Sequence, residues 1–262
     1  MKNPFANLFK KKDSAAPEIS PSAGGKPKKE SFFSKLLKSR LGKSSVKGEE
    51  ILGVDLSSNE IRLAQISSNK ANQWILEKFH VHKVDGLPEN ATVLEHPDKI
   101  AEELTIALQK AKISTSNAAI AIPVTSAIIR VVTSPLMTDE ELATAIASDS
   151  LWENLVQLTD NLDDYSIFHQ VINRDEKGNT MDILFVASKL ADINSYTDII
   201  KKSGLNAVII DVKCFALKSA VDQINQISGS IEESNLTAVL EFGLDENYVM
   251  ILYENNPIIT DI

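Results

Sequence analysis

The fold of this chain is decided by two stretches with one shared pattern, Ile51-Leu-Gly-Val-Asp-Leu-Ser-Ser-Asn-Glu-Ile-Arg-Leu-Ala-Gln-Ile66 and Leu236-Thr-Ala-Val-Leu-Glu-Phe-Gly-Leu-Asp-Glu-Asn-Tyr-Val-Met-Ile-Leu252. Each contains an apolar strand, an acidic residue, a tight polar turn and a second apolar strand. Turn amides can bind a phosphate while a neighbouring carboxylate holds the waters of its metal ion. One copy is typical of an ordinary hairpin, whereas two facing copies indicate a metal–phosphate site between two lobes.

The candidate residues of this phosphate and magnesium site lie in three parts of the chain. The first stretch supplies an acid, a polar turn and a cation, and the second supplies an acid and a glycine. A third part adds Asp211, which ends an apolar strand. The full set is Asp55, Ser57, Ser58, Asn59, Arg62, Asp211, Glu241 and Gly243.

Charge is unevenly distributed along the 262 residues, which carry a formal net charge of −9. Residues 1–50 contain 12 basic and 5 acidic side chains, and the remaining residues contain 15 basic and 31 acidic ones. A folded acidic body with a basic tail argues against nucleic acid as a partner, because phosphate contacts need positive charge on the folded surface.

A single cysteine, Cys214, excludes an intramolecular disulfide and is typical of a reducing compartment. Its apolar neighbours predict a buried, inert thiol. No apolar run has the length of a membrane span, and the N-terminus has no apolar signal region. We therefore expect a cytoplasmic protein.

Residues 1–48 are predicted to form a disordered basic tail with two short cationic-apolar clusters, one at 4–12 and the other at 32–41. The second cluster places Phe33, Leu36, Leu37 and Arg40 on one helical face. It could contact an anionic membrane surface, or dock on this chain or a partner. The tail could equally be only solubilising.

The body reads as an α/β fold. Strands at 51–56, 61–66 and 74–82 precede an amphipathic helix at 98–112 and a central strand at 118–122. A β-α-β-β block follows, with strands at 127–133, 165–172 and 181–187 and a helix from a capping box at Thr138 to about Leu151. The main fold resumes with a helix at 189–203 closed by Gly204, a strand at 207–211 and a helix at 215–227.

These elements predict three regions besides the tail. Residues 49–234 form a first lobe, with an inserted subdomain at about 124–188. Strands at 236–242 and 248–253 begin a second lobe, residues 235–262, which is too small to bury a core of its own. We therefore expect a C-terminally truncated chain with an incomplete second lobe.

Five strings in this order resemble the PilM family, the actin-like proteins of type IV pilus assembly that are related to FtsA. They are Leu52-Gly-Val-Asp-Leu-Ser-Ser-Asn-Glu-Ile-Arg62, Ala121-Ile-Pro-Val-Thr-Ser-Ala-Ile-Ile-Arg130, Met137-Thr-Asp-Glu-Glu-Leu142, Leu184-Phe-Val-Ala-Ser-Lys189 and Ile210-Asp-Val-Lys-Cys-Phe-Ala-Leu217. The resemblance covers about residues 50–262. It implies an actin-like, ribonuclease-H-type ATPase fold.

The resemblance also implies ligands and partners. Family members have an ATP and magnesium site, and PilM binds the cytoplasmic N-terminal peptide of the inner-membrane protein PilN in a groove beside the inserted subdomain. In this sequence the groove candidates are Ile128, Arg130 and Val132. The resemblance further implies self-association into a ring and a location at the cytoplasmic face of the inner membrane.

Departures from the family pattern fall on the nucleotide chemistry. Ser57 replaces a glycine, Glu60 adds negative charge, and Asp245 and Glu246 stand where small hydroxyl residues are expected. Lys213 replaces an acid that would orient water. Carboxylates close to a phosphate repel it unless a metal intervenes. These departures argue against nucleotide binding and more strongly against hydrolysis.

Three functions therefore stay open. The first is a non-enzymatic scaffold of a pilus or secretion machine. The second is an ATPase or small-molecule kinase of the same superfamily, for which Asp211 is the candidate acid. The third is an FtsA-like filament tethered to membrane.

A separate signal, His80-x-His82, places two imidazoles on one strand face. Metal sites use this geometry, but no Cys or acid cluster follows it in sequence. We interpret the pair as a solvated strand edge and predict no metal site formed by these residues.

Overall fold

The structure is a computed structural model, and it describes residues 50–68, 74–88, 90–147, 150–156, 161–228, 236–243, 246–253 and 256–261. From Glu50 onward the chain forms one compact unit. The basic tail predicted at residues 1–48, with both of its cationic-apolar clusters, lies outside the described residues.

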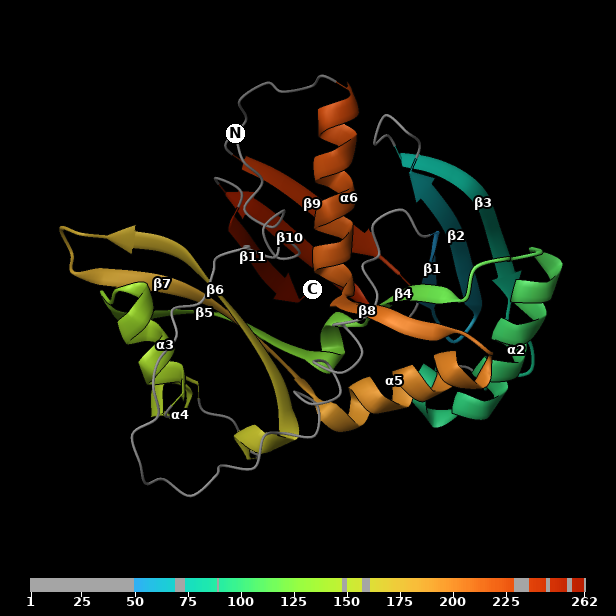
Figure 1. Cartoon of the computed structure of the whole chain (residues 1–262), viewed down its shortest axis with the longest axis horizontal. Coiled ribbons are helices and arrows are strands. Elements are labelled where there is room, and N and C mark those ends of the chain that lie inside the picture. Colours follow the sequence, from blue (N-terminus) through green and yellow to red (C-terminus); the bar gives the residue numbers. More distant parts are fainter. Residues whose placement is uncertain are drawn as a thin grey trace, which may run out of the picture. The chain divides into compact units, whose positions relative to one another are not determined.

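A five-stranded sheet forms the centre of the main fold (Figure 1), with the strand order β3-β2-β1-β4-β8. Its members are β1 (Ile51–Leu56), β2 (Glu60–Ser68), β3 (Trp74–Lys83), β4 (Asn117–Ile122) and β8 (Asn206–Val212). The first three strands are antiparallel, and β1, β4 and β8 run parallel. The three antiparallel strands and the central strand predicted from the sequence are confirmed.

Period-two alternation explains the inner strands, since every second residue of β1 and of β4 is buried. Helices α2 (Pro97–Lys110) and α5 (Leu190–Lys202) contact each other, and both pack on this sheet. α6 (Lys213–Ser228) contacts β4 and β8. Gly204 ends α5 with a φ of +88°, which confirms the predicted left-handed cap.

The block between β4 and α5 forms a sheet of its own, in the order β5-β7-β6. Its strands are β5 (Ala127–Pro135), β6 (Tyr165–Asp175) and β7 (Thr180–Lys189). The helix expected from Thr138 to about Leu151 is described in two parts, α3 (Asp139–Ala147) and α4 (Ser150–Leu155), and residues 148–149 between them lie outside the described residues. We call residues 124–189 the inserted module.

One face of the module's sheet packs on α3 and α4 (Figure 1). Trp152 of α4 lies 5.0 Å from the ring of Phe185 on β7, and both side chains are buried. The predicted capping box begins α3: Thr138 N donates to Glu141 at 2.9 Å, and Glu141 N donates to the Thr138 hydroxyl at 3.2 Å.

The C-terminal part forms a third sheet, β11-β10-β9. Its strands are β9 (Leu236–Phe242), β10 (Asn247–Tyr253) and β11 (Asn256–Asp261), all antiparallel. In the part of the chain that the structure describes, three short 3-10 helices connect other elements, η2 (Val93–Glu95), η3 (Val124–Ser126) and η4 (Leu162–Asp164). Within the residues described, no helix is long and apolar enough to cross a membrane.

Candidate functional site

The turn of the first hairpin satisfies two of its amides internally. Ser57 N donates to the Glu60 carbonyl at 3.0 Å, and Glu60 N donates to the Ser57 hydroxyl at 3.1 Å. The same hydroxyl lies 2.8 Å from Oδ1 of Asn59, and the neighbouring Ser58 is buried. Hydrogen bonds that involve Ser57 therefore hold the turn together, and they engage the N–H groups of Ser57 and Glu60 that a phosphate would need.

Asp55 lies on β1 directly opposite Arg62 on β2. Nη1 of Arg62 lies 3.1 Å from Oδ2 of Asp55, and its Nη2 pairs with Glu60. Oδ1 of Asp55 faces a second cation, Lys213 Nζ, at 3.3 Å. Both oxygens of the candidate magnesium-site carboxylate are thus paired with side-chain cations.

The second hairpin turns tightly at Gly243, whose N–H donates to the Glu246 carbonyl at 3.1 Å. A Cβ at position 243 would lie 2.8 Å from that carbonyl oxygen, which explains the glycine. The candidate Glu241 lies on β9 opposite Tyr248 on β10. Asp245, one of the acidic departures, lies outside the described residues.

Glu246 is the residue of the second hairpin that is joined to Asp55, through Lys213. Oε1 of Glu246 lies 3.0 Å from Lys213 Nζ, and its Oε2 accepts a hydrogen bond of 2.7 Å from Val124 N. The Glu246 side chain is only 4% exposed. The sequence marked Glu246 and Lys213 as departures from a family pattern but did not include either among the site residues.

Lys213 stays charged in this setting. Burial alone would lower the pKa of its ammonium, but Asp55 and Glu246 outweigh burial and hold the pKa above its usual value. Lys213 is the first residue of α6 and directly follows β8. Because β1 and β8 run parallel to β4 between them, their carboxyl ends meet at one edge of the sheet, which brings Lys213 to Asp55.

Two further residues lie at this edge, the half-buried Asp211 and the buried Cys214. Burial raises the pKa of Asp211, whose Oδ1 accepts a hydrogen bond of 2.8 Å from Val212 N. Cys214 is fully buried, and burial raises the pKa of its thiol to about 12. The prediction of a buried thiol is therefore confirmed, and its inertness stays a prediction that the raised pKa supports.

As arranged, these residues do not fit a magnesium-bound phosphate. The ammonium of Lys213 lies between Asp55, a candidate acid for the metal's waters, and Glu246, and an ammonium and a divalent cation repel each other. In the first turn, two backbone N–H groups already donate hydrogen bonds within the turn and are not available to a phosphate.

The three groove candidates of β5 lie on the face of the module that packs on α3 and α4. Val132 belongs to the module's buried core, and Ile128 packs against that core. Arg130 is exposed. Two of the three side chains are thus turned to the interior, where a peptide would have to compete with the core.

The other face of the same sheet has exposed apolar side chains at its edges. Val131 on β5 is 46% exposed and Phe168 on β6 is 40% exposed. Between them on β7 lie Leu184 and Val186, which are buried. We call Val131, Phe168, Leu184 and Val186 the apolar row. Sequence alternation on β5 could have found this face, because Val131 and Val132 point to opposite sides.

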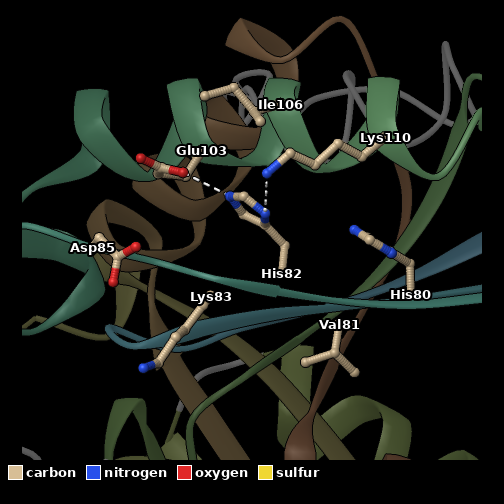
Figure 2. A pocket seen from close by; sticks show the side chains of 8 residues that line it. All are labelled: His80, Val81, His82, Lys83, Asp85, Glu103, Ile106 and Lys110. Carbon is tan, nitrogen blue, oxygen red and sulfur yellow. Dashed lines mark hydrogen bonds and ion pairs between the residues drawn. The ribbon is translucent and has the colours of Figure 1, made fainter.

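A second polar cluster joins β3 to α2, and Figure 2 shows His82 between Glu103 and Lys110. His82 Nε2 lies 2.6 Å from Glu103 Oε2, and Lys110 Nζ lies 3.5 Å from His82 Nδ1. Lys99 also pairs with Glu103 at 2.6 Å. The interpretation of His82 as a solvated edge residue is wrong, because the acid comes from a helix 21 residues away and the imidazole is buried.

His82, Glu103 and Lys110 line a pocket of about 370 Å³ together with His80 and Asp85. The hydrogen bond from Lys99 is the main cause that lowers the pKa of Glu103, and the hydrogen bond from His82 is the second. Within the described residues, no group of three or more His, Cys, Asp or Glu side chains is placed to hold a metal ion. The cluster therefore binds a strand to a helix through charge-assisted hydrogen bonds.

Among solved structures, the chain is similar to the PilM-PilN type IV pilus biogenesis complex, with a TM-score of 0.63 and 17% identity over 80% of this chain and 60% of that chain. It also aligns with the cytoplasmic domain of EpsL, an inner-membrane component of the type II secretion system of Vibrio cholerae, with a TM-score of 0.48 and 12% identity over 81% and 71% of the two chains. A Bacteroides thetaiotaomicron protein with an actin-like ATPase fold and unknown function aligns with a TM-score of 0.39 and 10% identity, over 82% and 71%.

The first of these similarities concerns the fold, and this chain spans 60% of the length of that neighbour. The α/β, actin-like fold class predicted from the sequence is confirmed. A family model described as type IV pilus assembly protein PilM matches residues 53–260, most of the chain. The chain belongs to the PilM family of type IV pilus assembly proteins.

Proposed function

We propose that this chain is a scaffold of the type IV pilus assembly platform that binds the short cytoplasmic N-terminal peptide of a PilN-type inner-membrane protein. Its place would then be the cytoplasmic face of the inner membrane. Family membership supports the proposal, as does the fold shared with a PilM that forms a complex with PilN. Asp55 is paired with Arg62 and Lys213, so it is not free to bind the metal ion of a nucleotide. This pairing favours a scaffold over an ATPase or a kinase.

The observation that carries the peptide site is the apolar row of the inserted module. Val131 and Phe168 stand exposed on the two outer strands, beside the buried Leu184 and Val186 of the central strand. A peptide with apolar side chains could bury the two exposed ones against a rigid sheet. We therefore place the peptide on this face, and not at Ile128 and Val132, whose side chains already serve the core.

The test is calorimetric titration of the full chain with a synthetic peptide that comprises the cytoplasmic N-terminal residues of a PilN-type protein. Phe168→Ala is expected to weaken binding about tenfold or more, as an aromatic side chain at the centre of an interface does. Phe79→Ala is the matched control, since Phe79 is an exposed aromatic residue on β3, outside the module. Val131→Asp, a charge in the apolar row, should weaken binding further.

Two results would overturn this assignment. If the wild-type chain does not bind the peptide, the scaffold function in this form is wrong. If Phe168→Ala and Phe79→Ala weaken binding equally, the apolar row is not the site. Ring formation and membrane contact of the tail stay predictions, and sedimentation with and without anionic vesicles tests both.

A further inference from the structure

Two carboxylate oxygens from different sheets face one ammonium. Oδ1 belongs to Asp55, near the carboxyl end of β1 in the five-stranded sheet, and Oε1 belongs to Glu246, in the turn before β10 of the C-terminal sheet. Lys213 Nζ lies 3.3 Å from the first oxygen and 3.0 Å from the second. Both oxygens are closed to solvent, so water does not neutralise them.

The remaining oxygens of both acids are engaged elsewhere. Arg62 holds Oδ2 of Asp55, and the backbone N–H of Val124 holds Oε2 of Glu246. Lys213 is therefore the cation that these two solvent-closed oxygens share. Buried carboxylates without such a partner are strongly destabilising, so the arrangement depends on the ammonium.

We propose that Lys213 is a tethered cation that takes the place of the nucleotide's metal ion and clamps the two hairpins together without any nucleotide. A lysine ammonium can donate three hydrogen bonds and is positively charged at neutral pH. It can therefore bridge two carboxylates, as a metal ion does through its bound waters. Because it is covalently part of α6, its effective concentration at the site is high and the clamp needs no free ligand.

Three segments meet at this clamp. Asp55 comes from β1, Lys213 from the start of α6, and Glu246 from the turn before β10. Glu246 also receives the N–H of Val124, which opens the inserted module. The relative placement of the main sheet, the module's entry and the C-terminal sheet is thus fixed by a residue of the chain. This inference is independent of peptide binding.

Thermal unfolding of the full chain with and without millimolar magnesium chloride tests the proposal. For the wild type and for Lys213→Arg, magnesium should leave the unfolding temperature of each protein unchanged, because the side chain at position 213 already supplies the cation. Lys213→Met should unfold at a lower temperature, and magnesium should raise that temperature by about 3 °C, since an ion that binds only the folded state stabilises it.

Lys218→Met is the matched control. Lys218 is also a buried ammonium of α6, paired with Asp222 at 2.6 Å, so its loss should lower stability without any gain of magnesium dependence. Magnesium rescue of Lys213→Met alone supports the tethered cation. Absence of that rescue, or equal rescue of Lys218→Met, overturns it.

A second measurement decides the question even where Lys213→Met does not fold. Calorimetric titration of the wild-type chain with Mg-ATP should give no binding heat at millimolar nucleotide. Micromolar binding by the wild-type chain would show that the ammonium does not replace the metal, and the proposal would fall whatever the variants do.

Discussion

Glu246 accepts a hydrogen bond of 2.7 Å from the backbone N–H of Val124, although 122 residues separate the two. Val124 begins η3, which leads into the inserted module, and Glu246 closes the turn before β10. The Glu246 carboxylate is buried, and Lys213 neutralises its other oxygen. A single side chain thus connects the module's entry to the C-terminal sheet.

Replacement of Glu246 by alanine should destabilise the fold by about 3 kcal/mol, because it leaves the Val124 N–H unsatisfied and Lys213 with one partner fewer. Glu246→Gln should cost less, since its amide oxygen still accepts from Val124 N. Urea unfolding followed by circular dichroism measures both. Equal losses for the two variants would show that the Val124 hydrogen bond contributes nothing.

Gly243→Ala should destabilise the second hairpin by about 2 kcal/mol, since overpacking against backbone cannot be relieved by a side-chain rotation. The added Cβ would lie 2.8 Å from the Glu246 carbonyl oxygen. Gly53→Ala is the control in the first hairpin, where the added Cβ would meet its nearest atom at 3.5 Å, an ordinary contact. The free energy of unfolding compares them, and a larger loss at position 53 would contradict the prediction.

The Glu103 cluster should make stability depend on pH. The pKa of Glu103 lies below its usual value of 4.5, so its ionised form is favoured in the folded state. Its contribution is complete well above that value and is lost as the pH falls through the lower, folded-state pKa. At neutral pH, Glu103→Gln should cost about 1 kcal/mol.

This difference between wild type and Glu103→Gln should shrink as the pH is lowered from 7 towards 3, since the wild-type carboxylate then becomes protonated as well. Melting temperatures across that range measure it. Glu102→Gln is a neighbouring control on the exposed side of α2. A difference that stays constant with pH would exclude Glu103 as the titrating group.

Cys214 should resist alkylation in the folded protein. Its thiol is fully buried and burial raises its pKa to about 12, so very little of the reactive thiolate is present near pH 8. Iodoacetamide labelling followed by mass spectrometry should show modification only after denaturant is added. Rapid labelling of the native chain would place Cys214 at the surface.

The strands and most helices could be predicted from the sequence because their patterns are local. Alternation of apolar residues in 51–56 and 117–122, the capping box at Thr138 and the glycine at 204 each act within a few residues. The helix expected to continue to about Leu151 is described as α3 up to Ala147 and α4 from Ser150, and residues 148–149 between them lie outside the described residues.

The candidate site could be predicted only in part. Asp55 and Arg62 pair across one hairpin, and an antiparallel turn of known length determines which residues lie opposite each other. The role of Lys213 required knowledge that β8 runs parallel to β4 and β1. In the same way, the partner of His82 is Glu103 on α2, and the local sequence of β3 could not identify it.

The sequence by itself determined the family, the order of elements and the two hairpins, since backbone preferences and periodic burial are properties of short segments. Only the tertiary structure decided that Lys213 stands between Asp55 and Glu246, and that Val132 faces the module's core while Val131 faces away. Electrostatic and packing partners depend on distance in space, and segments far apart in the chain become neighbours only through the way the sheets assemble.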